Sequence, residues 1–146
     1  NGTNDFAYPM DSWRKSYSLP SGPRTLSLKV RMPHNHSPDG EGAEEIAVLA
    51  KSIFEGGQPL AEILEQGVDG DEAWARFRTG VPLVSGELNF TRDTGKWQDR
   101  KWETIPASIE SGAGRVSATV PSDAKVFYLN LIDERRCIVS TRHVER

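Results

Sequence analysis

The stretch Thr25–Met32 reads TLSLKVRM and alternates polar with apolar side chains. A period of two residues is typical of a β-strand with one buried face. The polar residues 34–42 follow, and after them apolar side chains recur at helical spacing: Ile46, Leu49, Ala50, Ile53 and Phe54. Strand, polar loop and helix form the repeating unit of an α/β fold, so we expect this apolar stripe to pack on a sheet.

Beyond residue 60 the pattern changes to short runs of β-branched and aromatic residues separated by turns. Runs of this kind, spaced 8 to 14 residues apart, predict a small antiparallel β-sandwich of the immunoglobulin or fibronectin type. The expected strands are Ala73–Arg78, Leu83–Phe90, Trp102–Ile109, Arg115–Val120, Val126–Ile132 and Cys137–His143.

The chain is therefore expected to combine two parts, residues 1–59 with an α/β pattern and residues 60–146 as an all-β accessory domain. The first part contains a short helix near Pro9–Tyr17, one strand and one longer helix. A lone strand and helix bury too little apolar area to fold alone. We expect residues 1–59 to be the C-terminal portion of a larger α/β domain.

Composition excludes several classes of partner. The net charge is −3, and 18 Lys and Arg are scattered among 21 Asp and Glu, so no basic stripe predicts nucleic-acid binding. No apolar run approaches the roughly 20 residues that a membrane helix needs. The single Cys137 cannot form an internal disulfide and is expected to be a small buried apolar residue.

Three residues could carry acid–base chemistry: Asp5 near the start, and His34 and His36 just after the expected strand. In Gly2-Thr3-Asn4-Asp5 and Pro33-His34-Asn35-His36, the order, spacing and surroundings are similar to those of the catalytic acid and base of α/β-hydrolase esterases. The resemblance covers residues 1 to about 57 and is closest to the acetyl xylan esterase and dienelactone-hydrolase-like branch. β-rich C-terminal extensions are also familiar in bacterial esterases of this sort.

The resemblance implies that Asp5 orients a histidine, and that this histidine takes a proton from a serine hydroxyl. His36 is the preferred base and His34 the second choice. The nucleophile motif Gly-x-Ser-x-Gly is absent from the sequence, so we expect the chain alone to be inactive. The resemblance implies a C-terminal fragment of a serine carboxylic-ester hydrolase, with no cofactor and with an ester substrate such as an acetylated polysaccharide.

Two alternatives stay open. His34 and His36 with Asp39 could bind a metal, although a further ligand would have to come from the distant His143 or from acidic residues. The chain could instead be a non-enzymatic carbohydrate- or protein-binding sandwich, and four tryptophans are available either for its core or for stacking on sugars: Trp13, Trp74, Trp97 and Trp102.

Self-association and compartment are less closely defined by the sequence. A bare sheet edge and an apolar helix face would favour self-association. The resemblance is compatible with a secreted or periplasmic protein, but the sequence itself does not identify the compartment.

Overall fold

A computed structural model describes residues 1–146, except for the side chain of Asp39. The helices are α1 (Met10–Ser18), α2 (Pro38–Glu41) and α3 (Glu44–Phe54), with short 3-10 turns η1 (Trp97–Asp99) and η2 (Ser111–Ala113). The strands are β1 (Glu62–Asp69), β2 (Glu72–Arg78), β3 (Leu83–Thr91), β4 (Glu103–Glu110), β5 (Arg115–Thr119), β6 (Val126–Asp133), β7 (Ile138–Ser140) and β8 (Val144–Glu145).

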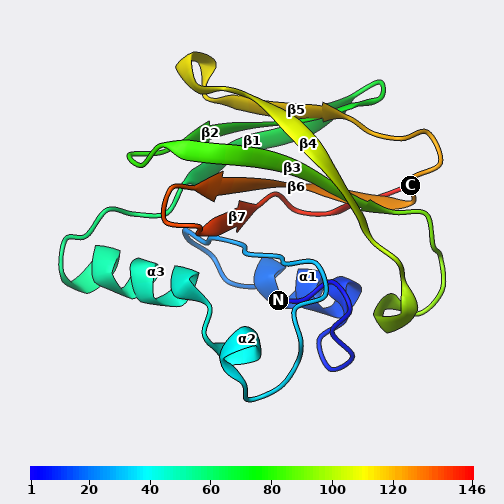
Figure 1. The fold of residues 1–146 in the computed structure, drawn as a ribbon, viewed down its shortest axis with the longest axis horizontal. Helices are drawn as coiled ribbons and strands as arrows, with labels where there is room; N and C mark the ends of the chain where they lie inside the picture. The colour runs from blue at the N-terminus through cyan, green and yellow to red at the C-terminus, as the bar shows by residue number, and fades with distance from the viewer.

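The strands of the described chain form one antiparallel sheet that curls into a half-barrel (Figure 1). Their order is β1-β2-β5-β4-β3-β6-β7, and β8 also pairs with β6. Strands β1 and β7 are the two ends of the curl and do not pair with each other. The half-barrel therefore stays open along one seam.

The main hydrophobic core fills the inside of the curl. Phe77 of β2, Leu88 of β3, Val116 of β5 and Leu129 of β6 are all buried there, although their strands are distributed around the sheet. Buried residues alternate with more exposed ones along β2, as period-two packing requires. Burial of the core side chains favours the curled shape of the sheet.

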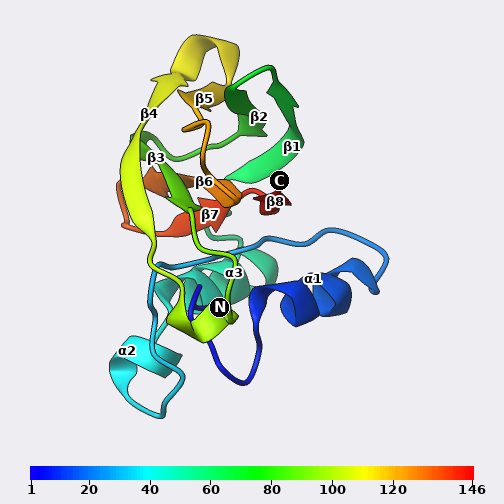
Figure 2. The same ribbon diagram turned by 90° about the vertical axis from the view of Figure 1, so that its right-hand side faces the viewer.

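The N-terminal segment and the helices form a second layer on the outer face of β6 and β7 (Figure 2). Met10 and Leu28 are fully buried against Tyr128 of β6. Val48 of α3 packs with Cys137 and with Val139 of β7. Cys137 is thus a buried free cysteine, as expected.

A buried polar network ties the segment around Leu28 to the sheet. The Ser140 hydroxyl accepts a hydrogen bond from the Leu28 N–H (2.8 Å) and donates one to Oδ1 of Asn130 (2.6 Å). The Asn130 amide donates to the Leu28 carbonyl (3.3 Å), and the Ser140 N–H donates to the Leu26 carbonyl (2.8 Å). The side chains of Ser140 and Asn130 thereby satisfy backbone groups that a neighbouring strand would otherwise satisfy.

The expected fold class is wrong. Residues 1–59 do not show an α/β-hydrolase portion, and the β part is a single curled sheet rather than a two-sheet sandwich. Thr25–Met32 forms no strand, and its only ladder contact is an isolated parallel bridge between Lys29 and Gly2. The alternation of polar and apolar residues in Thr25–Met32 has another cause. Leu28 packs on the outer face of β6, and its backbone N–H bonds to the Ser140 side chain and not to a neighbouring strand.

Most individual elements are confirmed within a few residues. The six strands expected after residue 72 correspond to β2–β7, and the two expected helices correspond to α1 and α3. Strand β1 was not predicted, because Glu62–Asp69 contains acidic residues and a glycine and its side chains are mostly exposed or half-buried. A strand with so few buried side chains leaves no period-two signal.

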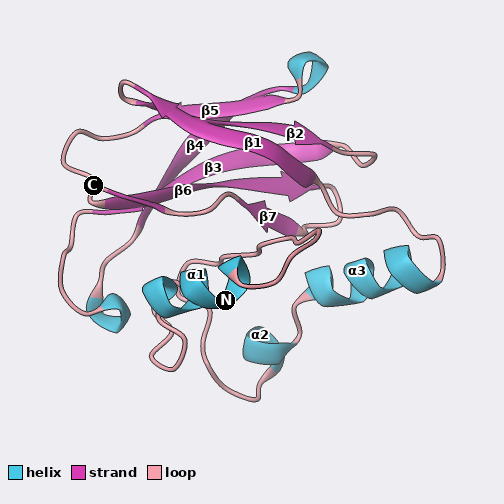
Figure 3. Cartoon of the chain, turned by 180° about the vertical axis from the view of Figure 1, so that it is seen from behind, coloured by secondary structure: helices cyan, strands magenta, loops and turns pink.

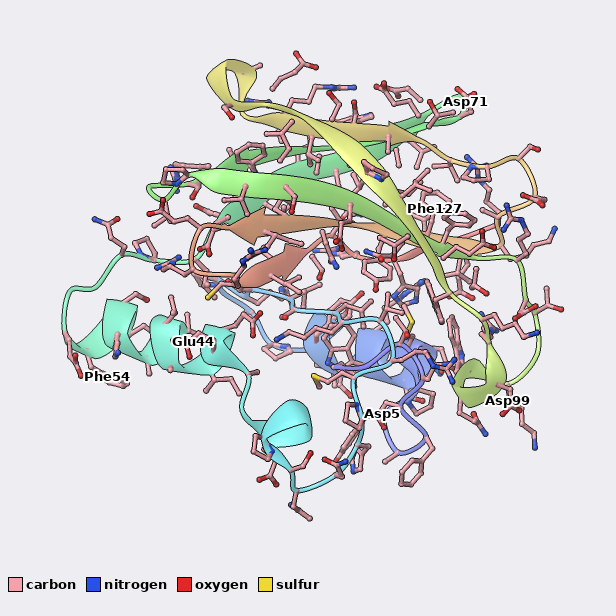
Figure 4. The ribbon with its side chains drawn as sticks, viewed as in Figure 1. Asp5, Glu44, Phe54, Asp71, Asp99 and Phe127 are labelled. Carbon is pink, nitrogen blue, oxygen red and sulfur yellow. The ribbon has the colours of Figure 1, made fainter. Side chains whose placement is uncertain are left out.

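The face on which α3 packs was also predicted wrongly. Ile46, Ile53 and Phe54 are 66%, 65% and 83% exposed, whereas Glu45 and Val48 are buried. The Glu45 carboxylate accepts hydrogen bonds from Lys29 Nζ (2.9 Å) and from the Ile138 N–H (2.8 Å). These two bonds hold the Glu45 side of the helix against the sheet, so the apolar stripe points outward, and Figure 4 shows Phe54 at its free end.

His143 occupies a second buried polar position, where α1 meets the C-terminal strand. Its side chain is fully buried and neither ring nitrogen makes a hydrogen bond among the described residues. Arg14 and Asp11 approach from α1, Arg100 and Trp97 from the η1 loop, and Glu145 lies on β8, with its Oε1 3.5 Å from Nε2. Burial, and then the nearby Arg14 and Arg100, lower the pKa of His143 to about 3.

We expect Ser140→Ala to destabilise the fold by about 1–3 kcal/mol, because it leaves the Leu28 N–H and Asn130 Oδ1 buried without partners. Urea unfolding followed by circular dichroism measures this loss. The exposed Ser108 of β4 provides the matched control, and Ser108→Ala is expected to change stability by less than about 0.5 kcal/mol. Equal effects of the two substitutions would contradict the role of the network.

His143 makes stability fall with acid. Between its ordinary pKa of 6.5 and its folded pKa of about 3, the unfolded chain binds a proton that the folded chain does not. Stability is therefore lost as the pH falls through this window, by about 1.4 kcal/mol per pH unit. We expect His143→Phe to reduce this slope in urea unfolding between about pH 4 and about pH 6. His36→Phe, at a side chain that is 97% exposed, is the matched control, and an equal reduction of the slope by both substitutions would contradict the role of His143.

Candidate acid–base site

A short parallel pairing brings Asp5 and His34 to the same place. The Thr3 N–H donates to the Lys29 carbonyl and the Lys29 N–H donates to the Asn1 carbonyl, both at 3.0 Å. Because the two paired segments run in the same direction, the residues that follow each of them emerge at the same end. Asp5 leaves one segment and His34 leaves the other.

Two backbone features make the approach possible. A Cβ at Gly2 would lie 2.2 Å from the Met32 carbonyl oxygen, so only glycine fits at that position. Arg31 adopts a left-handed conformation with φ 56°, which turns the chain out of its extended course and towards the His34 loop. The Thr3 hydroxyl stabilises this turn by accepting a hydrogen bond from the Arg31 N–H, with 3.0 Å between the oxygen and the nitrogen.

The Asp5 carboxylate is buried, and both of its oxygens make hydrogen bonds. Oδ1 accepts the N–H groups of Ala7 and Tyr8, each at 2.8 Å, and Oδ2 lies 3.0 Å from Nδ1 of His34. The side chain is only 6% exposed. Figure 4 shows Asp5 below α1, on the side of the helical layer away from the sheet.

These contacts keep Asp5 ionised. Burial alone would raise the pKa of its carboxyl group, but the Tyr8 N–H, the His34 ring and the Ala7 N–H together lower the pKa below its usual value of 3.8. An ionised carboxylate can only accept hydrogen bonds, so Nδ1 of His34 carries the proton that it donates to Oδ2. The lone pair of the neutral ring is then on Nε2.

The His34 ring is held from two sides and open on the third. Phe6 meets it edge-on with 5.2 Å between ring centroids, and the Tyr8 ring is tilted against it at 5.5 Å. The His34 side chain remains 37% exposed. A fixed ring with a free basic nitrogen can accept a proton from a hydroxyl group or from water.

The structure therefore brings His34, and not the preferred His36, to Asp5. The His36 side chain is 97% exposed and its Nδ1 pairs with Glu41 on the short helix α2. The loop that separates the two histidines by only two residues points them at different carboxylates. Spacing along the sequence could not distinguish them, because either histidine could have reached Asp5.

Phe6 and Tyr8 are parts of the site that were not predicted from the sequence. Their signal was present, since two aromatic residues directly after Asp5 are unusual for an exposed turn, and they are 70% and 59% exposed. The backbone donors of Ala7 and Tyr8 could not have been identified from residue type. They belong to the turn that Asp5 itself caps.

The alternative metal site of His34, His36 and Asp39 lies partly outside the described residues, because the Asp39 side chain is not among them. Within the described residues, no group of three His, Cys, Asp or Glu side chains could hold a metal ion. His143 is buried beside Trp97, in surroundings different from those of His34 and His36.

Three of the four tryptophans pack around the buried cluster of Met10, Leu28 and Tyr128: Trp13, Trp97 and Trp102.

A scan of the chain against models of known protein families finds no match, and a search of curated proteins finds no related protein. The resemblance to α/β-hydrolase esterases is therefore without a family match, and the antiparallel half-barrel overturns it. Among the described residues, no helix has both the length and the apolar character needed to cross a membrane.

We expect His34→Gln to raise the pKa of Asp5, because the substitution removes the charged form of the ring and weakens a hydrogen bond to the carboxylate. Carbon-13 NMR of the aspartate carboxyl groups measures the change during an acid titration. His36→Gln is the matched control and should leave the Asp5 titration in place. An Asp5 titration that is the same in both variants and the parent chain would show that the Asp5–His34 contact is not formed in solution.

Proposed function

We propose that Asp5 and His34 are the acid and the base of a site that hydrolyses carboxylic esters through a hydroxyl nucleophile. The observation that supports the proposal is the 3.0 Å contact between Asp5 Oδ2 and His34 Nδ1, made by an ionised and buried carboxylate. The proposal rests on this geometry alone and requires no particular fold around it.

In the proposed reaction, Nε2 of His34 accepts the proton of the hydroxyl group as its oxygen attacks the ester carbonyl carbon. Asp5 holds the ring by its Nδ1–H and stabilises the imidazolium that forms. The same proton then passes from Nε2 to the leaving alcohol as the carbon–oxygen bond breaks. Water repeats the sequence on the acyl intermediate.

The nucleophile has to be supplied to this site. Among the described residues no hydroxyl group is hydrogen-bonded to His34, whose single side-chain partner is Asp5. We therefore expect the chain by itself to give no multiple turnover of p-nitrophenyl acetate. The competence of its base can nevertheless be measured directly, because a neutral imidazole attacks activated acyl donors.

The test compares the two histidines as competitors for diethyl pyrocarbonate, with the modified peptides quantified by mass spectrometry. Accessibility alone favours His36, which is 97% exposed against 37% for His34. If Asp5 orients and activates His34, we expect His34 to react faster in spite of its lower exposure. Asp5→Asn should remove this advantage and lower the rate at His34 at least about threefold.

The same variants can be tested with p-nitrophenyl acetate in a single-turnover experiment. The acyl carbon bonds to Nε2 and p-nitrophenolate leaves, so its absorbance reports acetylation. We expect the rate to fall with His34→Ala and to change little with His36→Ala. Faster modification of His36, or a rate that is insensitive to Asp5→Asn, would refute the proposed function.

A further inference from the structure

A groove runs along the open seam of the half-barrel and is lined by residues of β1, of β7 and of the segment 23–26. Figure 3 shows the backbone of β1 and β7, the two strands at the ends of the curled sheet. Its volume is about 690 Å³. Leu49 of α3, Leu60, Ile63 and Leu64 line its apolar part, and Arg24 and Arg142 line its polar part. This volume is in the range of sites that hold small ligands and short peptide segments.

One wall of the groove is an unpaired strand edge. Strand β1 pairs with β2 on one side, and no backbone hydrogen bond among the described residues joins its other side to a neighbour. The register of β1 shifts between Ile63 and Glu65, and the intervening Leu64 is 48% exposed and lines the groove. The edge therefore offers free N–H and C=O groups next to an apolar surface.

At Gln66 a side chain, and not the strand backbone, bonds across the seam. Its side-chain amide donates to the Arg142 carbonyl (3.0 Å), and its Oε1 accepts the Arg142 N–H (2.7 Å). These are the two bonds that a residue on an adjacent antiparallel strand would form. Gln66 closes the seam at this point, and the groove is the part of the seam between β1 and residues 23–26 that is left open.

The groove is lined by two arginines and two glutamates, Arg24, Arg142, Glu62 and Glu65, and only the glutamates have ion-pair partners among the described residues. Glu62 and Glu65 of β1 are paired with Arg78 and Arg76 of β2. Arg24, by contrast, donates to the backbone carbonyls of Tyr17 and Pro20, and neither Arg24 nor Arg142 has a carboxylate partner among the described residues. A ligand with carboxylate groups would therefore complement the groove.

We propose that this groove binds an extended acidic peptide, which adds to the edge of β1 as a further strand and places its carboxylates against Arg24 and Arg142. The main-chain bonds of the peptide supply affinity, and alternate side chains enter the apolar part of the groove. This is a binding activity separate from the Asp5–His34 pair, and it does not rest on the proposed hydrolytic function.

Two other occupants fit less well. A second copy paired edge to edge through β1 would meet the register shift between Ile63 and Glu65 in both strands, and such irregularities interrupt edge-to-edge pairing. An oligosaccharide site is usually built around aromatic stacking surfaces, yet none of the four tryptophans lines this groove. The combination of free strand edge, apolar floor and arginines is that of a peptide site.

The probe is a six-residue peptide that alternates valine with glutamate, acetylated at one end and amidated at the other. We expect its titration into nitrogen-15-labelled protein to shift the amide resonances of Ile63–Gln66, and a fluorescein-labelled form to give the affinity by anisotropy. The same peptide with lysine in place of glutamate should bind at least about tenfold more weakly. A glutamate peptide with alternate amides N-methylated should lose binding, because it cannot form the strand bonds.

The protein variants give an independent check. Arg24→Ala and Arg142→Ala should each weaken binding of the glutamate peptide about fivefold. Lys125→Ala removes an exposed cation that does not line the groove and should leave binding unchanged. Equal binding of the lysine peptide, undiminished binding of the methylated peptide, shifts confined to residues away from β1, or no binding at millimolar peptide would each overturn the proposal. Because none of these variants touches Asp5 or His34, failure here leaves the hydrolytic proposal standing.

Discussion

The packing of Leu28 on the outer face of β6 and β7 is the interaction on which the N-terminal layer of the molecule depends. Ser140 and Asn130 satisfy the backbone groups of Leu28, and Tyr128 covers its side chain. The segment from Leu26 to Lys29 is held to the sheet by these side chains and by the Ser140 N–H, which donates to the Leu26 carbonyl. Helices of 9 and 11 residues are marginal in isolation, so α1 and α3 depend on packing against this segment and against β6 and β7.

The acid–base pair follows from that packing. Once Leu28 is fixed, Lys29 can pair with Gly2 and Thr3, and the two segments leave the pairing side by side. Lys29 also reaches Glu45, whose carboxylate binds the Ile138 N–H and thereby sets the rotation of α3. One extended stretch of chain thus determines both the position of Asp5 relative to His34 and the direction in which the apolar side of α3 points.

The parts of this structure that could be read from the sequence are those in which one side of an element is buried. Strands β2 to β7 were recognisable as short runs of β-branched and aromatic residues, because they fill the curl of the sheet or pack beneath the helices. Strand β6 is covered on both faces and is buried along nearly its whole length. The pattern of Thr25–Met32 is equally clear, but alternation reports burial of a face and not the presence of a pairing neighbour. The helical spacing of apolar residues in α3 likewise indicated an apolar face. It did not show that the Glu45 side of the helix would pack on the sheet instead. Proximity of Asp5 to a histidine was expected only from the resemblance to α/β hydrolases, which the fold overturns, and the choice of His34 depended on the turn at Arg31.

The topology also has a consequence for how the chain acquires its structure during synthesis. Asp5, Leu28 and His34 leave the ribosome long before Ser140, the residue that accepts the Leu28 N–H. The pairing of β3 with β6 likewise joins segments some 40 residues apart. Residues 5–34 are therefore made before the strands on which they dock, and they gain stable structure only after those strands have emerged. The acid–base pair is translated well before the part of the chain that organises it.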